Sequence, residues 1–503
     1  MTGVDLGVEE PWELPEGWAW SRIDHVTEKV ATIDPRQSLT DDTFDYVDLG
    51  AIGPTGLIEP TRLLGRDAPT RARQLISPGD TLYSCVRVYL GNIVFFASGI
   101  ENSVASTAFC VLRPTEAIDP RFLHHFVRSD RFRQWMIPLQ RGNSPPAVVD
   151  SDVKSQPLPL PPLAEQRRIV ARIDALFAEI AEGEAALARA RAALETFRRA
   201  LLKAAVTGEL TREWREREAD RDGAGSELMR IRAERAMASG SRRRGRKGAV
   251  TEPIVPTDLP DLPKGWLWAS LDDMLLGIEA GLNVSAEGRP PRPDEIGIVK
   301  ISAVTWGEFD ETASKTLPPD FEFDERNEIR VGDFLFSRAN TLELVGAPVI
   351  VEAIGRRLLL SDKVLRFRLA TGCDRWVELV LKSSLGRRQI EALATGAQLS
   401  MRNISQDSIR SISIPLPPPA ETAEILRRVS DTLAAQADTL ALLDAEAADA
   451  ARLRQSVLKA AFEGRLVPQD PTDEPARAML ERLAAKPAAI APRRRGRPKR
   501  TER

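Results

Sequence analysis

The 503-residue chain is poor in the residues that build disulfides, metal sites and most nucleophilic triads, with only three cysteines and three histidines. Cys85, Cys110 and Cys373 are far apart and never form a Cys-x-x-Cys spacing, which supports neither a disulfide framework nor a zinc site. No stretch approaches about 18 uninterrupted apolar residues, and the first twenty residues lack an apolar core. We therefore expect a cytoplasmic protein with neither a signal peptide nor a membrane span.

The sequence also lacks the motifs of cofactor-dependent catalysis. No Gly-Lys pair occurs, which excludes a Walker phosphate loop, and neither Gly-x-Gly-x-x-Gly nor the Asn/Asp-Pro-Pro-aromatic tetrapeptide of amino-methyltransferases is present. His25, His124 and His125 are expected to be structural or surface residues. Asp152-Val-Lys154 matches only the end of a nuclease pattern and has no convincing acidic partner before it. We predict no catalytic residue, no metal ligand and no cofactor in this chain.

Charge of one sign is not in excess, because 70 Lys and Arg stand against 73 Asp and Glu, for a net charge of -3. This balance rules out a generally polycationic nucleic-acid coat protein. It does not exclude local basic surfaces, because mean charge says nothing about distribution. The length predicts roughly three domain-sized units.

What the chain does contain is an internal repeat. Four segments recur in the same order at offsets of 248 to 256 residues: Leu14–Trp20 with Leu262–Trp268, Ile76–Ser84 with Ile329–Ser337, Leu158–Glu165 with Ile414–Glu421, and Leu202–Leu210 with Leu458–Leu466. Small loop insertions explain the drift in offset. The segments between the matches differ almost completely, so the two copies share a frame but carry different faces.

Each copy begins with a globular part. Short apolar runs such as Thr81–Tyr83, Asn92–Phe96 and Ala108–Leu112 end at Gly-Asp, Pro-Gly and Gly-Asn turns, a pattern that predicts strands. Residues 121–140 are expected to form a helix packed on the sheet, and residues 376–394 take its place in the second copy. Each copy therefore predicts an α/β or α+β domain of about 150 residues.

A long helix follows each globular part. Ile173, Ile180, Leu187, Leu194 and Leu201 lie seven residues apart, and Ile169, Leu176, Ala190 and Phe197 fill the intermediate heptad position. The second copy keeps the seam from residue 421 to 462 but interrupts it with Gln436 and Thr439. Because one amphipathic helix of this length cannot bury its stripe alone, we expect the two to pair as an antiparallel coiled coil. Gly208 and Gly464 are predicted helix stops. Shorter helices are then expected at 226–238 and 475–485.

These motifs resemble the DNA specificity subunits of type I restriction-modification systems. The resemblance is carried by Leu-Pro-x-Gly-Trp opening each globular part, Pro-Leu-Pro-Pro-Leu-Ala-Glu-Gln166 opening the first long helix, and Leu-Leu-Lys-Ala-Ala-Val-Thr-Gly-Glu-Leu-Thr211 closing it. It implies two α/β target recognition domains joined by the helix pair, with pseudo-two-fold symmetry. The implied segments are residues 1–160 (first recognition domain), 161–210 (first spacer helix), 211–257 (short helix and basic linker), 258–416 (second recognition domain), 417–466 (second spacer helix) and 467–503 (short helix and basic tail).

The resemblance also implies a noncatalytic function. The chain would bind double-stranded DNA at a bipartite, asymmetric sequence and hold two methyltransferase subunits, which carry S-adenosylmethionine, together with a restriction and translocase subunit. A noncatalytic DNA-reading or coiled-coil scaffold of another DNA-defence assembly is the alternative. A single-chain modification or cleavage enzyme would need the cofactor motif that is absent.

Base readout requires Arg, Asn, Gln, Ser or Thr presented from loops. The candidates are Arg71, Arg73, Arg87, Arg141, Asn143 and Ser144 in the first copy, and Arg338, Asn340, Gln398, Arg402 and Asn403 in the second. Arg87 and Arg338 follow equivalent Leu-aromatic-Ser segments, and the loop from Arg141 to Ser144 aligns with Gly396-Ala-Gln398. For each residue the alternative is a surface salt bridge. Trp18, Trp20, Trp266 and Trp268 are predicted core anchors rather than base-stacking platforms.

Basic segments follow the short helices. Arg495-Gly-Arg497-Pro resembles an AT-hook, in which an Arg-Gly-Arg turn enters a narrow minor groove, and Arg244-Gly-Arg-Lys247 is a weaker copy. A solvated tail that binds phosphates without sequence preference is the favoured alternative. In either case the tails are expected to add salt-dependent affinity for DNA.

Overall fold

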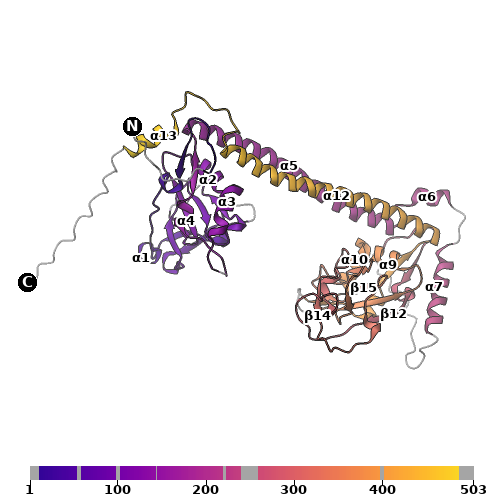
Figure 1. The fold of residues 1–503 in the computed structure, drawn as a ribbon. Helices are drawn as coiled ribbons and strands as arrows, with labels where there is room; N and C mark the ends of the chain where they lie inside the picture. Colours follow the sequence, from indigo (N-terminus) through magenta and orange to yellow (C-terminus); the bar gives the residue numbers. More distant parts are fainter. Residues whose placement is uncertain are drawn as a thin grey trace, which may run out of the picture. The chain divides into compact units, whose positions relative to one another are not determined.

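The computed structural model describes residues 11–53, 58–97, 102–142, 144–218, 223–239, 259–396 and 401–485. The chain divides into two compact units, residues 1–187 with 444–503 and residues 188–443. Each unit contains a globular domain and parts of both long helices, α5 (Leu163–Val206) and α12 (Pro419–Phe462) (Figure 1). Among the described residues, no helix is long and apolar enough to cross a membrane.

The globular domain of the first unit contains two four-stranded sheets and a two-stranded ribbon. In one sheet the strand order is β2-β9-β6-β7 (Thr27–Glu28, Phe109–Pro114, Thr81–Ser84, Ile93–Phe95). In the other it is β4-β3-β8-β5 (Thr61–Leu64, Thr43–Val47, Ser103–Ser106, Ala72–Leu75), with β3 and β8 parallel. The ribbon pairs β1 (Ala19–Arg22) with β10 (Pro157–Leu160), so the start and the end of the domain are adjacent. The three predicted strand runs correspond to β6, β7 and β9.

The second unit repeats this plan. Its main sheet has the order β12-β19-β15-β17 (Leu275–Ala280, Val364–Leu369, Phe334–Ser337, Pro348–Ile350). A three-stranded sheet has the order β14-β13-β18 (Ser314–Thr316, Ile296–Val299, Arg357–Leu359), again with one parallel pair. Two ribbons pair β11 (Leu267–Ser270) with β21 (Ser413–Leu416) and β16 (Ala339–Asn340) with β20 (Arg402–Asn403). The common frame predicted from the repeat is confirmed.

The helical segment that covers the sheet is two helices rather than the one predicted. α2 (Pro120–Val127) ends before Ser129, whose hydroxyl accepts a hydrogen bond from Phe132 N at 3.3 Å and begins α3 (Asp130–Met136). In the second unit Ser383 separates α9 (Asp374–Lys382) from α10 (Ser384–Leu393) in the same way. A serine in extended conformation at an N-cap interrupts a helix more strongly than the apolar periodicity favours its continuation.

The two long helices run antiparallel within each unit. In the first unit Arg454 pairs with Glu184 at 2.8 Å, and in the second Gln436 donates to the backbone oxygen of Leu194 at 2.7 Å. Gln436, which interrupts the heptad pattern, is therefore a buried seam residue with its amide satisfied. Phe197 differs from its predicted seam position, because 51% of this residue is exposed.

The segment after each long helix packs on the globular domain of the other repeat. In the first unit Ala476, the first residue of α13 (Ala476–Ala484), donates its backbone N–H to Gly17 O at 2.9 Å. In the second unit Ala224, the first residue of α7 (Ala224–Ser239), donates to Gly265 O at 3.0 Å. A further helix, α6 (Arg212–Arg217), precedes α7. Each compact unit is therefore assembled from both repeats.

A tryptophan and a glutamate fix each of these joints. Trp18 Nε1 donates to Glu165 Oε2 at 3.0 Å, and Trp266 Nε1 donates to Glu421 Oε2 at 2.8 Å. Both tryptophans and both carboxylates are buried, and burial raises the pKa of Glu165. Glu421 also accepts from the Thr211 hydroxyl at 2.7 Å. The motifs Leu-Pro-x-Gly-Trp and Pro-Pro-x-Ala-Glu are thus repeated because they meet in this joint, and the tryptophans are core anchors as predicted.

Candidate nucleic-acid interface

Two neighbouring loops carry most of the predicted DNA-binding residues that the structure describes. The first loop leaves the end of β6 in the first unit and of β15 in the second. Cys85 N donates to Ala108 O at 2.9 Å and Cys85 O accepts from Val148 N at 2.9 Å. Arg338 makes the same two backbone bonds, to Lys363 O at 2.9 Å and from Ile404 N at 3.1 Å. The hydrogen-bond frame therefore begins at equivalent residues in both units.

This frame corrects one residue correspondence. Because Arg338 occupies the position of Cys85, the residue equivalent to Arg87 is Asn340, not Arg338. The next bridges agree, since Val86 pairs with Ala147 in the first unit and Ala339 pairs with Asn403 in the second. The sequence alignment failed here because the two loops share no residues after the common serine.

The second loop is closed by a reciprocal pair of backbone bonds. Arg141 and Ala147 exchange N–H to O bonds of 2.7 and 2.9 Å, and Thr395 and Asn403 exchange two of 2.8 Å. Pro146 O also accepts from Arg87 N at 2.9 Å, which ties the first loop to the second. Arg87, Arg141 and Ser144 thus gather in one unit, and Asn340, Arg402 and Asn403 gather at the equivalent place in the other.

The side chains in these loops differ in how free they are. Arg87 and Asn403 are exposed, and among the described residues no hydrogen bond to either side-chain amide or guanidinium group is found. Arg141 is held by Asp152 through two bonds of 3.0 Å. The backbone N–H of Val149 and then this guanidinium lower the pKa of Asp152. Arg402 donates to Gly396 O at 2.8 Å. Arg338 is half-buried, with an unpaired buried Nε.

Two predicted residues lie on a different sheet. Arg71 and Arg73 belong to the segment of β5, whose sheet does not include β6. Arg73 pairs with Asp34 at 2.7 Å, and this guanidinium lowers the pKa of the Asp34 carboxyl. The geometry of Arg73 is that of the surface salt bridge named as its alternative. Asn143, Gln398, Arg495, Arg497 and the basic segment 242–247 lie outside the described residues.

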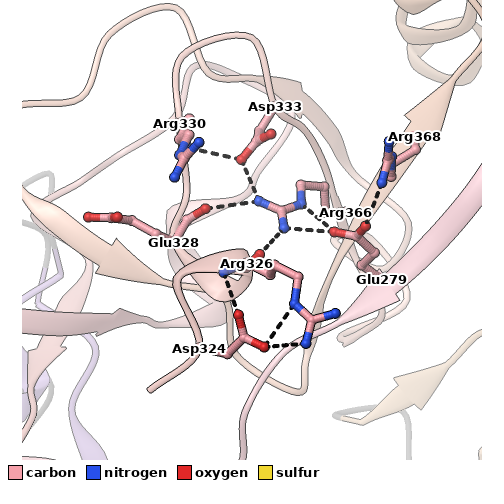
Figure 2. A network of polar contacts seen from close by, with 8 residues as sticks. All are labelled: Glu279, Asp324, Arg326, Glu328, Arg330, Asp333, Arg366 and Arg368. Atoms are coloured by element: carbon pink, nitrogen blue, oxygen red, sulfur yellow. Dashed lines mark hydrogen bonds and ion pairs between the residues drawn. The ribbon is translucent and has the colours of Figure 1, made fainter. Parts of the chain in front are cut away.

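A largely buried ion pair at the start of β6 and of β15, at the strand end opposite the first loop, was not predicted. Asp80 accepts from Ser77 N at 2.8 Å, which closes the turn at Gly79, and pairs with Arg113 at 2.6 Å. Asp333 accepts from Arg330 N at 2.9 Å and pairs with Arg366 at 2.9 Å. Figure 2 shows that Arg366 also reaches Glu279, at 2.7 Å. The repeated Gly-Asp dipeptide was the visible signal, but the arginine lies about thirty residues later and carries no local pattern.

The side chains that the two loops present have the chemistry of nucleic-acid recognition. Arg, Asn and Ser side chains offer hydrogen bonds to base edges and phosphates. His124 and His125 are buried, and burial lowers the pKa of both. Within the described part of the chain, no group of three His, Cys, Asp or Glu residues could hold a metal ion. All three cysteines are free and buried.

Comparison with known proteins agrees with this chemistry. The family model described as the type I restriction modification DNA specificity domain matches residues 57–188. The EcoKI specificity subunit of Escherichia coli K12 is 27% identical over 95% of this chain and 97% of its own length. The EcoEI specificity subunit of Escherichia coli is 25% identical over 84% of this chain and 79% of its own.

A solved structure supports the same assignment. One chain from work on complex assembly and conformational transition of the type I R-M system aligns with a TM-score of 0.63 and 25% identity, covering 90% of this chain and 100% of that one. Neither the sequence relatives nor this structure favours another kind of DNA-defence scaffold. The repeated frame, its two loops and these matches lead to one conclusion: the chain belongs to the specificity subunits of type I restriction-modification systems, the noncatalytic DNA-recognition components.

Proposed function

We propose that this chain recognises a bipartite, asymmetric DNA sequence, with each unit reading one half-site through its pair of loops. The observation that carries the proposal is that one hydrogen-bonded loop frame presents different side chains in the two units. Arg87 and Ser144 occupy it in the first, and Asn340 and Asn403 in the second. Arginine matches the acceptors of guanine, whereas asparagine matches the donor and acceptor pair of adenine, so the halves should differ in sequence.

Mapping N6-methyladenine in a host that expresses the chain with its partner methyltransferase tests this proposal. A gapped motif with two unlike halves is expected. Arg87→Ala should relax or abolish one half and Asn340→Ala the other, while Arg73→Ala serves as a matched control because that arginine is already paired with Asp34. An ungapped motif, or an effect of Arg87→Ala on both halves alike, would contradict the assignment.

The methyl transfer itself belongs to a partner subunit in this proposal. S-adenosylmethionine would bind to the methyltransferase, because the sequence of this chain has no motif for it. Purified chain incubated with DNA and labelled methyl donor should transfer nothing. Turnover by the chain alone would refute the noncatalytic role. A restriction and translocase subunit is the further partner that we propose for cleavage, and the cytoplasm, where the DNA lies, is the proposed location.

We assign methyltransferase docking to the helix pair. Phe197 in the second unit and Leu453 in the first are 256 residues apart, the offset of the repeat, and are 51% and 52% exposed. Leu453 lines a groove of about 560 Å³ between α5 and α12, together with Ile180, Gly183 and Leu187. Exposed apolar side chains in such a groove are typical of protein interfaces. Two equivalent positions imply two copies of the same partner.

Light scattering of the assembled complex tests this stoichiometry. Phe197→Glu and Leu453→Glu should each remove one methyltransferase copy, and the double variant both, because a charge replaces the apolar contact. Thr196→Glu adds the same charge at an exposed neighbouring position and should leave two copies bound. Retention of both copies by the double variant would exclude this docking surface.

The basic tails are a separate part of the proposal. We assign salt-dependent DNA affinity to the segment 493–503, which contains Arg495 and Arg497. Its deletion should weaken DNA binding at low salt and flatten the salt dependence, without changing the recognised sequence. Unchanged affinity at low salt would remove the tail from the interface.

A further inference from the structure

The tip of the first loop of unit 1 presents two adjacent large apolar side chains to solvent. Tyr89 is 47% exposed and Leu90 is 55% exposed, and both belong to the 3₁₀ helix η4 (Val88–Leu90) between β6 and β7. We propose that Tyr89 and Leu90 are specificity-determining residues that read the first half-site by apolar contact with the 5-methyl group of a thymine. This inference rests on the proposed function and names a contact within it.

The backbone of this tip is arranged so that the two side chains must face outward. Arg87 has φ +50° and Gly91 has φ +66°, so left-handed residues bracket η4 on both sides. A left-handed conformation strains any residue other than glycine and persists where the surroundings hold it. Here Arg87 N is bonded to Pro146 O at 2.9 Å, and Leu90 N is bonded to Arg87 O at 2.9 Å.

Val88 anchors the tip from below. Only 3% of Val88 is exposed, because it packs in the core of the domain with Tyr83 and Phe132. With Val88 fixed inward, Tyr89 and Leu90 cannot turn into the core without breaking the bonds of η4. The exposure of the pair is therefore a property of a held loop, and it is maintained against the hydrophobic effect.

The surroundings of the tip favour DNA as the occupant. Arg87 immediately precedes η4, and the loop closed by Arg141 and Ala147 is bonded to it through Pro146. Arg141 is engaged with Asp152, whereas Arg87 is exposed. An exposed arginine beside apolar side chains suits a groove that offers phosphates, base acceptors and methyl groups together. In the equivalent segment of unit 2, Thr341 is followed by Leu342 and Glu343, so the adjacent apolar pair is not repeated there.

The free energies involved distinguish contact with the edge of a base from insertion of a side chain between base pairs. A side chain inserted between base pairs must unstack them, and the free energy of unstacking is recovered only when the bent DNA wraps around more of the protein. Contact with the thymine methyl group, the apolar feature of the major-groove edges, requires no deformation. Burying one methyl group corresponds to about a fourfold change in affinity. Two apolar side chains at a loop tip are enough to make a contact of this size.

The test uses the complex of the full chain with its methyltransferase and duplexes that carry the mapped motif. Each thymine of the first half-site is replaced singly by deoxyuridine, which removes only the methyl group. One replacement should weaken binding of the wild-type complex by about fourfold, whereas Leu90→Ala should bind the two duplexes equally. Tyr89→Ala should reduce the same sensitivity. Val331→Ala, at an exposed apolar residue of unit 2, is the matched control and should keep the wild-type response.

Three results would overturn the inference. The first is that the wild-type complex binds every deoxyuridine duplex as tightly as the unmodified duplex. The second is that Leu90→Ala weakens binding to cognate and to random DNA equally. The third is bright 2-aminopurine fluorescence at a base step of the first half-site that Leu90→Ala removes, which would indicate insertion between base pairs. In each case a complex that still methylates a gapped motif leaves the proposed function intact. Failure of the proposed function would instead appear as the absence of any gapped motif.

Discussion

The joint between the end of α12 and the first globular domain makes a quantitative prediction for Gly464→Ala. Gly464 ends the helix with φ +70°, and a Cβ there would lie 2.2 Å from Pro15 Cγ. The left-handed conformation costs an alanine about 1–2 kcal/mol, and an overpacked contact costs about 1–3 kcal/mol. We expect the free energy of unfolding of this unit to fall by roughly 2–5 kcal/mol.

Urea unfolding followed by tryptophan fluorescence measures this change, because Trp18 lies three residues after Pro15. Gly183→Ala is the matched control. Gly183 lies inside α5, where a Cβ would meet nothing within 4 Å, so the same substitution should stabilise by about 0.5–1 kcal/mol through helix propensity. One chemical change thus has opposite signs at two glycines.

Combination with Pro15→Ala separates the two contributions. Removing the proline ring should relieve the steric part of Gly464→Ala and leave the backbone part of about 1–2 kcal/mol. A stability of Gly464→Ala within about 0.5 kcal/mol of wild type, the range of an inert surface substitution, would show that the tail of the second repeat does not pack on the first domain. Additive effects of the two substitutions would show that the ring and the Cβ do not meet.

Two further predictions concern buried charges and histidines. Burial lowers the pKa of His124 and His125 below 6.5, so the stability that their neutral forms contribute is present above pH 6.5 and is lost as the pH falls. The loss is up to about 1.4 kcal/mol per pH unit for each histidine. Urea titrations between pH 7.5 and 5 should show this slope, and the double variant His124→Gln with His125→Gln should flatten it. Asp80→Ala should cost about 3 kcal/mol, because it leaves the Arg113 guanidinium without a carboxylate partner, with only Leu75 O and the Ser77 hydroxyl to accept from it. Asp333→Ala should cost less, since Arg366 keeps Glu279 at 2.7 Å. Equal losses in urea unfolding would contradict this difference.

The heptad pattern predicted the helix pair but could not predict which positions remain buried. Ile169 is buried, whereas Phe197, four heptads later in the same register, is half exposed. A straight α-helix drifts by about 20° per heptad relative to a seven-residue repeat, hence by about 80° over this distance. The helix pair can compensate for this drift by supercoiling, or the seam can turn to solvent near the end of the helix. Which of the two happens depends on contacts with the partner helix and the nearby domain, and the local sequence does not specify these contacts.

The candidate interface was predicted by residue type and only in part by position. Arg87 and Arg141 were found because turn residues and arginines in a divergent segment are visible in the sequence. The equivalence of Arg87 with Asn340 depends on backbone hydrogen bonds to segments far along the chain. Backbone bonds of this kind do not depend on residue type, so the equivalence cannot be read from the sequence. The same holds for Tyr89 and Leu90, since an apolar pair in a loop has no sequence signal that distinguishes exposure from burial.

The sequence by itself determined the repeat, the two α/β domains and the long helices, because each of these rests on local pattern. Only the tertiary structure decided that each compact unit is built from both repeats, with Trp18 bonded to Glu165 beside the tail of the second repeat and Trp266 bonded to Glu421 beside that of the first. The physical reason is that the segment after each long helix could pack on the globular domain of its own repeat or on that of the other repeat, and the local sequence is compatible with both. The antiparallel pairing of α5 and α12 brings the end of each helix to the start of the other, and so selects the second arrangement.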